Sequence, residues 1–318
     1  LHTVATSDAT RDSCADYGDA YPQHKDTLGD TNPEYNLTCC TKHKIMAAKT
    51  ALDKDRVSIA YLQLDDWWYY GPKPVQNFTG GVKCVGQWRL PEDTYPGGLD
   101  ALHKDYAAPF MLYGPYFCKE NQWNQTLWPQ GADAGVPPPE ESRAFYTKVF
   151  RYGHAHGAVG YEVDFMSNLF LSVPEFRRTL DASTLWQSGM NQAALQQQPP
   201  MPIQWCMMQP SDLLSSLQFD AVTNGRASYD YAGEANWDIG GSSILFWSLG
   251  LRPSKDNFWS SDGQKRQPGF FQSNPGTNGE LNAILATMSQ GPVGPSDGAG
   301  QHNTTRLLRT CAADGTIL

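Results

Sequence analysis

The sequence predicts a (β/α)8 barrel, or TIM barrel, in which eight parallel strands alternate with helices. Two observations support this prediction. Apolar, strand-like runs alternate with helix-like segments from residue 57 onward, and acids and tryptophans follow the carboxyl ends of these runs, where such barrels build their active sites. A chain of 318 residues with 40% hydrophobic content can bury one large core, so we expect a single barrel domain over residues 1–318.

Each element of the barrel can be assigned to a segment. The first strand is expected within residues 11–21, and the others within the runs 57–68, 108–117, 157–166, 200–208, 219–230, 242–250 and 282–294. A short helix is expected near 97–106. A longer one is expected over 139–157, because Phe145, Val149 and Tyr152 have helical spacing and Gly157 is a typical stop.

Composition and motifs exclude several other classes. The formal charge of -9 argues against a nucleic-acid partner, and no apolar run approaches the ~20 residues of a membrane span. A doubly wound fold would need a glycine-rich phosphate loop, and neither G-x-G-x-x-G nor G-x-x-x-x-G-K occurs. His154 and His156 stand two apart on a predicted helix and do not share a face. We therefore expect neither a metal nor a cofactor.

Sequons and cysteines indicate a secreted, extracellular or lumenal protein. Four Asn-x-Ser/Thr sequons are candidate glycosylation sites, at Asn36, Asn77, Asn124 and Asn303. Seven cysteines are typical of an oxidising compartment, and we expect two or three disulfides and at least one unpaired thiol. Cys14, Cys39 and Cys40 cluster near the start of the sequence, and Cys84 and Cys118 lie in predicted loops. Cys206 lies in the apolar run PIQWCMM and is predicted to stay a free thiol.

The run GAVGYEVDFM, residues 157–166, carries two carboxylates in a strand that is otherwise apolar. Because strand side chains alternate between faces, Glu162 and Asp164 share one face. Asp65, Asp66 and Asp230 follow other strands. A retaining glycosidase needs two carboxyl groups about 5 Å apart, one as nucleophile and one as proton donor. Aromatic residues beside acids, as in LDDWWYYG at 64–71, also suit sugars, so the expected partner is a carbohydrate.

Several motifs resemble, in the same order, those of glycoside hydrolase family 36, the alpha-galactosidase and raffinose synthase group. GAVGYEVDFM is similar to the nucleophile strand G-V-D-G-V-K-V-D of that family. GRASYDY at 225–231 resembles the R-x-x-x-D that carries its acid/base, and LDDWW resembles the sugar-binding D-D-G-W. GPVGPSDGAG at 291–300 resembles its closing loop. The likeness covers most of residues 57–318.

The resemblance implies a role for each matching residue. Asp164 would be the nucleophile, Asp230 the acid/base and Arg226 its partner, while Asp65 and Asp66 would bind sugar hydroxyls. Three tryptophans are further candidates for the sugar platform: Trp67, Trp205 and Trp259. The implied activity is that of a retaining glycosidase or transglycosidase on alpha-galactoside-like sugars. These two reactions share an intermediate and differ only in the acceptor.

The chain departs from the family in one residue and in its domains. The family has Lys two residues before the nucleophile, and Glu162 stands there in this chain, replacing three donors with two acceptors. An inactive barrel that serves as a carbohydrate-binding or structural extracellular glycoprotein is therefore the alternative function. The family's N-terminal β-sandwich and C-terminal sheet domain have no counterpart, so we expect a barrel fragment of a longer chain with further domains.

Overall fold

The computed structural model describes residues 4–6, 42–65, 68–69, 84–90, 92, 95–130, 133–228, 238–262, 278–312 and 316. Its main sheet has seven strands in the order β1-β2-β3-β7-β8-β9-β10, and every neighbouring pair is parallel. The strands are β1 (Val4–Thr6), β2 (Tyr61–Leu64), β3 (Phe110–Tyr113), β7 (Ala158–Val163), β8 (Ile203–Trp205), β9 (Val222–Arg226) and β10 (Arg252–Ser254).

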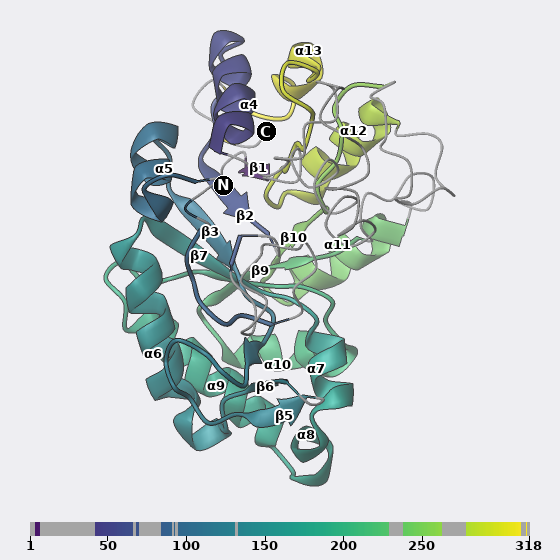
Figure 1. Cartoon of the computed structure of the whole chain (residues 1–318). Helices are drawn as coiled ribbons and strands as arrows, with labels where there is room; N and C mark the ends of the chain where they lie inside the picture. Colours follow the sequence, from purple (N-terminus) through teal and green to yellow (C-terminus); the bar gives the residue numbers. More distant parts are fainter. Residues whose placement is uncertain are drawn as a thin grey trace, which may run out of the picture.

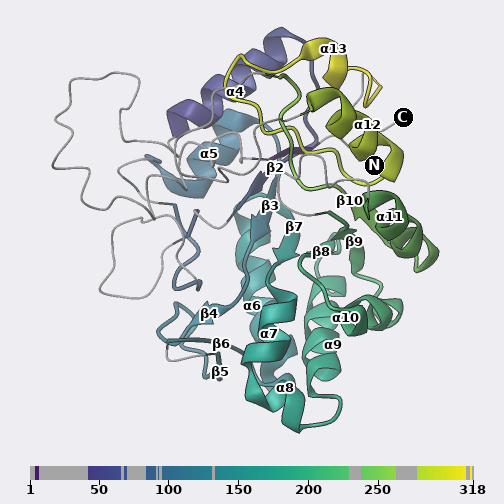
Figure 2. The ribbon, with the colours of Figure 1, turned by 90° about the vertical axis from the view of Figure 1, so that its right-hand side faces the viewer.

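The sheet curls, and helices cover its outer side (Figures 1 and 2). Beyond β10, a parallel bridge joins Phe258 to Pro295, at the place where an eighth strand of a barrel would lie. The described residues therefore form a partial (β/α) barrel. A closed barrel of eight strands, as the sequence predicts, is not seen within them.

Helices follow the strands along the chain. They are α4 (Lys42–Lys54), α5 (Gly98–Tyr106), α6 (Pro139–Ala155), α7 (Met166–Ser172), α8 (Pro174–Arg178), α9 (Ala182–Leu195), α10 (Pro210–Ser215), the 3-10 turn η2 (Ser216–Gln218), α11 (Asp238–Ser248), α12 (Gly279–Ser289) and α13 (Thr304–Leu307). A small antiparallel sheet, β4 (Phe117–Cys118), β6 (Ala134–Val136) and β5 (Trp128–Gln130), is inserted between β3 and α6. The helices predicted near 97–106 and over 139–157 are confirmed as α5 and α6.

Two predicted strands are wrong. The apolar run 242–250 lies largely in α11, and the run 282–294 begins inside α12. The strand β10 and the bridge at Pro295 come directly after these helices. Periodicity does not separate a short apolar run of a strand from one of a helix, and here both helices expose part of the run, including Ile244 and Met288.

The first strand also differs in position. β1 pairs with β2 from residues Val4–Thr6, ahead of the segment 11–21 in which it was expected. Residues 11–21 lie outside the described residues.

An aromatic core joins the sheet to the helices around it. Tyr161 of β7 is fully buried and packs against Phe150 and Tyr146 of α6, with ring centroids 5.3 and 6.3 Å away. Its hydroxyl donates to the carbonyl of Gly114 at 2.7 Å, which satisfies the one polar atom of the ring. The outward face of β7 is therefore rigidly packed, and this holds the opposite face, with Glu162 and Asp164, in place.

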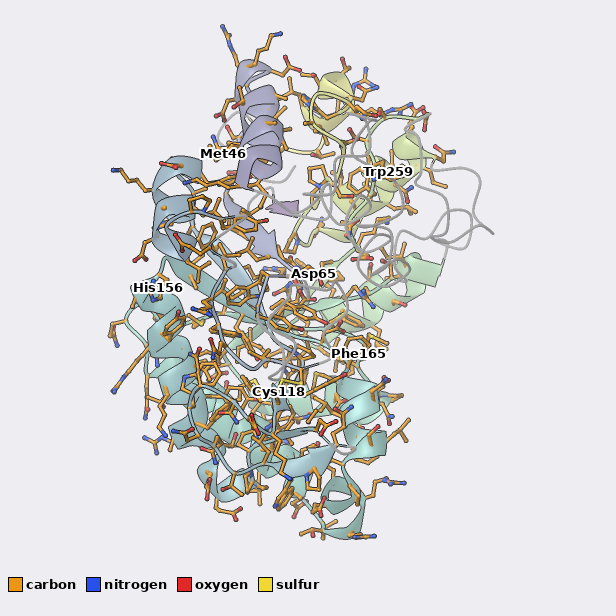
Figure 3. The ribbon with its side chains drawn as sticks, in the orientation of Figure 1. Met46, Asp65, Cys118, His156, Phe165 and Trp259 are labelled. Carbon is orange, nitrogen blue, oxygen red and sulfur yellow. A yellow bond between two sulfur atoms is a disulfide. The ribbon has the colours of Figure 1, made fainter. Side chains whose placement is uncertain are left out.

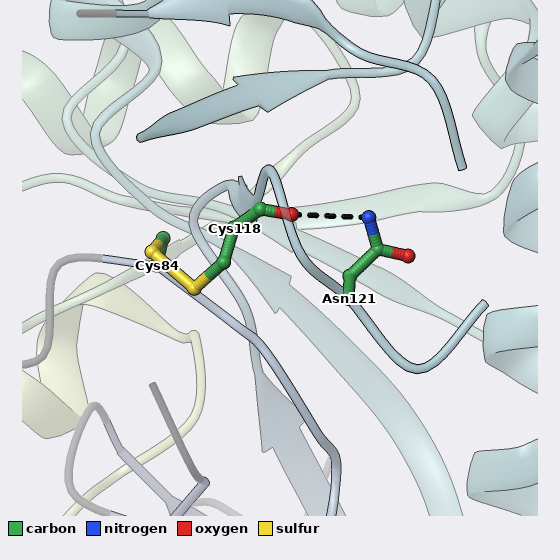
Figure 4. The surroundings of a disulfide bond; sticks show 3 residues. All are labelled: Cys84, Cys118 and Asn121. Atoms are coloured by element: carbon green, nitrogen blue, oxygen red, sulfur yellow. Dashed lines mark hydrogen bonds between the residues drawn. A yellow bond between two sulfur atoms is a disulfide. The ribbon is translucent and has the colours of Figure 1, made fainter. Parts of the chain in front are cut away.

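Cys84 and Cys118 form a disulfide that anchors the small sheet (Figure 4), with Asn121 donating to the carbonyl of Cys118 at 3.0 Å. Among the described cysteines, Cys206 and Cys311 are free and buried. The prediction for Cys206 is thereby confirmed, and Cys311 is a second free thiol. The other three cysteines, Cys14, Cys39 and Cys40, lie outside the described residues.

Replacing Cys84 and Cys118 together by alanine should lower the free energy of unfolding by about 3–4 kcal/mol, since the bond closes a loop of 34 residues. Urea unfolding would measure the loss. Cys311→Ala, which removes a buried thiol outside this bond, is the control and should cost less. Equal losses in the two variants would contradict a stabilising role for the disulfide.

Candidate active site

Four side chains form a polar layer on the inner face of the sheet: Gln63, Glu162, Gln204 and Asn224. The register places Glu162 beside Gln204, and Gln204 beside Asn224, on adjacent strands. Glu162 Oε2 accepts a hydrogen bond from Gln63 Nε2, and its Oε1 accepts from Gln204 Nε2 at 2.9 Å. Asn224 Nδ2 donates in turn to Gln204 Oε1. Both oxygens of Glu162 are thus engaged within this layer.

A second layer lies one step nearer the carboxyl ends of the strands. It contains Asp65, Asp164, Cys206 and Arg226, each two residues after a member of the first layer and so on the same face. Asp65, Asp164 and Glu162 are 9%, 8% and 4% exposed, so three carboxyl groups from two strands gather in a nearly buried space. Figure 3 shows Asp65 near the middle of the molecule.

Asp164 is held by its neighbours on both oxygens. Tyr113 Oη donates to Oδ2 at 3.1 Å, and the backbone N–H of Phe165 donates to Oδ1 at 2.6 Å. Phe165 has a left-handed backbone with φ of 55°, which turns the chain sharply from β7 into α7. Cys206 directly follows the adjacent strand β8, and its backbone N–H donates to the carbonyl of Val163 at 2.9 Å, which places it beside Asp164. The carboxylate of Asp164 is therefore fixed in one orientation.

Burial dominates the electrostatics of this site. It raises the pKa of Glu162 well above its usual value, and the charges of Asp65 and Asp164 raise it further. Arg226 and the hydrogen bond from Gln204 oppose this rise only in part. Burial likewise raises the pKa of the Cys206 thiol. Burial and the two neighbouring carboxyl groups thus both favour the protonated form of Glu162.

Arg226 is a cationic group of this site. Its guanidinium lies 3.8 Å from Asp256 Oδ2, and the backbone N–H of Asp256 donates to Ser228 Oγ at 2.8 Å. These contacts tie the end of β9 to the segment that follows β10. Arg226 thus stands between the acids of the second layer and Asp256.

The structure brings together only some of the predicted site residues. Asp65, Glu162, Asp164 and Arg226 share the inner face of the sheet, whereas three others, Asp66, Trp67 and Asp230, lie outside the described residues. Trp205 lies on the outer face, because it alternates with Gln204, and its ring packs 5.8 Å from that of Phe219. The structure therefore does not support Trp205 as a sugar platform.

Trp259 and the sequons lie at other places. Trp259 is buried after β10, between Phe258, which bridges to Pro295, and Ser260, which bonds to Asp297 (Figure 3). Asn124 is exposed, as a glycosylation site must be. Asn303 is half-buried, and its side-chain oxygen caps α13 by accepting from the N–H of Arg306. Asn36 and Asn77 lie outside the described residues.

Sequence reasoning missed the amides of the first layer, the hydroxyl of Tyr113 and the position of Cys206 beside the end of β7. A signal was present for the amides, since Gln63 precedes Asp65 by two residues, as Glu162 precedes Asp164 and Asn224 precedes Arg226. The side chains of such pairs share a face. These pairs can be joined into layers only when the order of the strands in the sheet is known.

Two other kinds of site find no support in the described part of the chain. No group of three or more His, Cys, Asp and Glu residues there could hold a metal ion. The pentapeptide at 294–298 has the G-x-S-x-G spacing of a serine-hydrolase elbow, which exposes its serine. Ser296 is instead fully buried and donates to Asn257 Oδ1 at 2.8 Å.

Within the residues that the structure describes, no helix has the length and apolar character to cross a membrane.

Solved structures of glycosidases share this fold. They include a GH27 β-L-arabinopyranosidase from Geobacillus stearothermophilus, with a TM-score of 0.60, 12% identity, and 86% of this chain and 72% of that chain covered. A candidate alpha-galactosidase from Bacteroides fragilis has a TM-score of 0.53, 12% identity and coverages of 85% and 55%. The alpha-N-acetylgalactosaminidase NagBb from Bifidobacterium bifidum, in complex with GalNAc, has a TM-score of 0.50, 13% identity and coverages of 90% and 47%.

These likenesses show a glycosidase-like fold for this chain. At 12–13% identity they show the fold alone, and the chain spans about half the length of two of the three structures. No protein-family model and no curated protein matches the sequence.

Proposed function

We propose that the chain is the barrel of a retaining alpha-glycosidase or transglycosidase that acts on alpha-galactoside-like sugars. The observation that carries the proposal is Asp164, which directly follows β7 on the inner face and has both carboxylate oxygens held by Tyr113 and Phe165. A fixed, nearly buried carboxylate at the carboxyl end of a barrel strand is suited to attack a bound sugar. The glycosidase-like fold supports the same reading.

In the proposed reaction, an oxygen of Asp164 attacks the anomeric carbon as the bond to the glycosidic oxygen breaks. Asp230 gives its proton to the leaving oxygen. A water or a sugar hydroxyl then attacks the glycosyl-enzyme ester, passes its proton to Asp230 and frees Asp164. Asp65 and Asp66 are proposed to bind sugar hydroxyls, and Arg226 is proposed to balance the negative charge of the acids.

The alternative is a carbohydrate-binding barrel without catalysis, and Glu162 favours it. This residue takes the place of a lysine in the resembling family, and both its oxygens are engaged by Gln63 and Gln204. With both oxygens occupied, Glu162 cannot supply the three ammonium donors of that lysine. Secretion is proposed for either function, on the grounds of the disulfide and of the exposed sequon at Asn124.

Trapping of the glycosyl-enzyme tests the proposal. The protein would be incubated with a panel of alpha-configured activated glycosyl fluorides, followed by intact mass measurement and peptide mapping. We expect a glycosyl adduct on Asp164 with the galactosyl reagent and none on Asp164→Asn. A folded protein that gives neither adduct nor turnover with any sugar would favour the binding barrel.

A further inference from the structure

A cavity of about 580 Å³ lies at the carboxyl ends of β8 and β9, against α10 and α11. Its volume is within the range of small-molecule sites. Of the thirteen residues that line it, six have large apolar side chains and five are polar or charged. The six are Met207, Met208, Leu213, Ile239, Leu245 and Phe246. Leu245 is 49% exposed and Met207 is 36% exposed, so apolar surface faces solvent at the rim of the cavity.

Two of the apolar side chains that line the cavity, Met208 and Phe246, are packed against strand β9. A side chain at Gly225 of β9 would come within 2.5 Å of Met208 and 2.7 Å of Phe246, so the glycine lets both residues pack directly on the strand. The loop that carries Met207 and Met208 is also anchored. The carbonyl of Met207 accepts from the N–H of Ser167 at 2.9 Å, and Gln209 begins α10 with a capping box. These contacts therefore hold the apolar side chains that line the cavity in fixed positions.

The cavity adjoins the acids of the candidate active site. Arg226, which belongs to the second layer, also lines it. Met207, which lines the cavity, directly follows Cys206, and the N–H of Cys206 donates to the carbonyl of Val163, the residue before Asp164. Ser167 in the first turn of α7 also lines the cavity, three residues after Asp164. A molecule joined to a sugar at Asp164 would thus find this cavity beside it.

We propose that the cavity receives an apolar aglycone, an alkyl or aryl group linked to the sugar through the glycosidic oxygen. This inference rests on the proposed function for its sugar. A second sugar in the cavity would lose water from its hydroxyl groups where apolar side chains offer them no hydrogen bonds, and this desolvation costs free energy. A hydrocarbon chain or ring gains free energy in the same place by leaving water. The chain is accordingly selective for glycosides of apolar alcohols over oligosaccharides.

Binding to the full chain carrying Asp164→Asn tests the inference, because this variant leaves the ligands intact. Titration calorimetry would compare n-octyl and methyl alpha-D-galactopyranoside. We expect the octyl compound to bind at least about tenfold more tightly, since seven more CH₂ groups leave water. Leu245→Asp, added at the rim, should reduce this ratio to less than about threefold. Ile244→Asp is the matched control, since Ile244 is 73% exposed on the same helix and does not line the cavity.

Free 1-octanol separates this inference from the proposed function. Saturable binding of octanol, weakened at least about tenfold by Leu245→Asp and unchanged by Ile244→Asp, would support the cavity as the apolar site whichever sugar the protein uses. Equal binding of octanol to the three proteins, or equal affinities for octyl and methyl galactoside, would overturn the inference. Turnover of methyl galactoside by the wild-type protein depends only on the proposed function. Its measurement therefore tests that function separately from the cavity.

Discussion

Asp164→Gly is expected to lower the rate of turnover of alpha-galactosyl fluoride by a factor on the order of 10⁴, because the glycosyl-enzyme ester cannot form without the carboxylate. Added azide should restore part of the turnover, since the anion fits the vacated space and attacks the anomeric carbon from the same side. The product would be a β-galactosyl azide, which NMR identifies by its anomeric coupling.

Tyr113→Phe is the matched control for this experiment. It keeps the carboxylate of Asp164 and removes a single hydrogen bond to Oδ2, so a loss of roughly tenfold is expected, without rescue by azide. If azide failed to produce the β-azide in folded Asp164→Gly, or if Asp164→Gly retained wild-type turnover, Asp164 would not be the nucleophile.

Glu162→Gln is expected to stabilise the protein above pH 4.5, increasingly so as the pH rises. The pKa of Glu162 is raised by burial in the folded state and stays near its usual value of 4.5 in the unfolded chain. Between these two values the unfolded chain releases a proton that the folded protein keeps, so wild-type stability falls as the pH rises. Gln carries no charge, keeps one oxygen that can accept from Gln204, and removes this dependence. Its NH2 group can bond to Gln63 once the amide of Gln63 turns its oxygen inward.

Thermal unfolding of both proteins between pH 4 and pH 8 measures the effect. The difference in Tm should be smallest near pH 4 and grow toward pH 8. Asp262→Asn is the control with the opposite sign: the N–H of Gly279 and the side chain of Arg306 lower the pKa of Asp262 in the folded state. That variant should lose stability at neutral pH, and the loss should vanish as the pH falls. A Tm difference for Glu162→Gln that does not change with pH would mean that the carboxyl is ionised.

Much of the barrel was predictable from local pattern. The alternation of side chains in the run 157–166 correctly placed Glu162 and Asp164 on one face, because the period of a strand is two wherever the strand lies. The helix over 139–157 was predictable for a similar reason, since its apolar stripe, first-turn acids and terminal glycine are all local signals. The free thiol of Cys206 followed from its apolar surroundings.

The remaining features depend on contacts between segments distant in the chain. The runs 242–250 and 282–294 are apolar enough for either a strand or a helix, and packing beside β10 decides for helix. The amides of Gln63 and Gln204 meet Glu162 only because β2, β7 and β8 curl around one interior. Trp205 faces outward for the same reason. A residue's own sequence sets the period of its strand, whereas the neighbouring strands and helices determine which face becomes the interior and which partners it meets there.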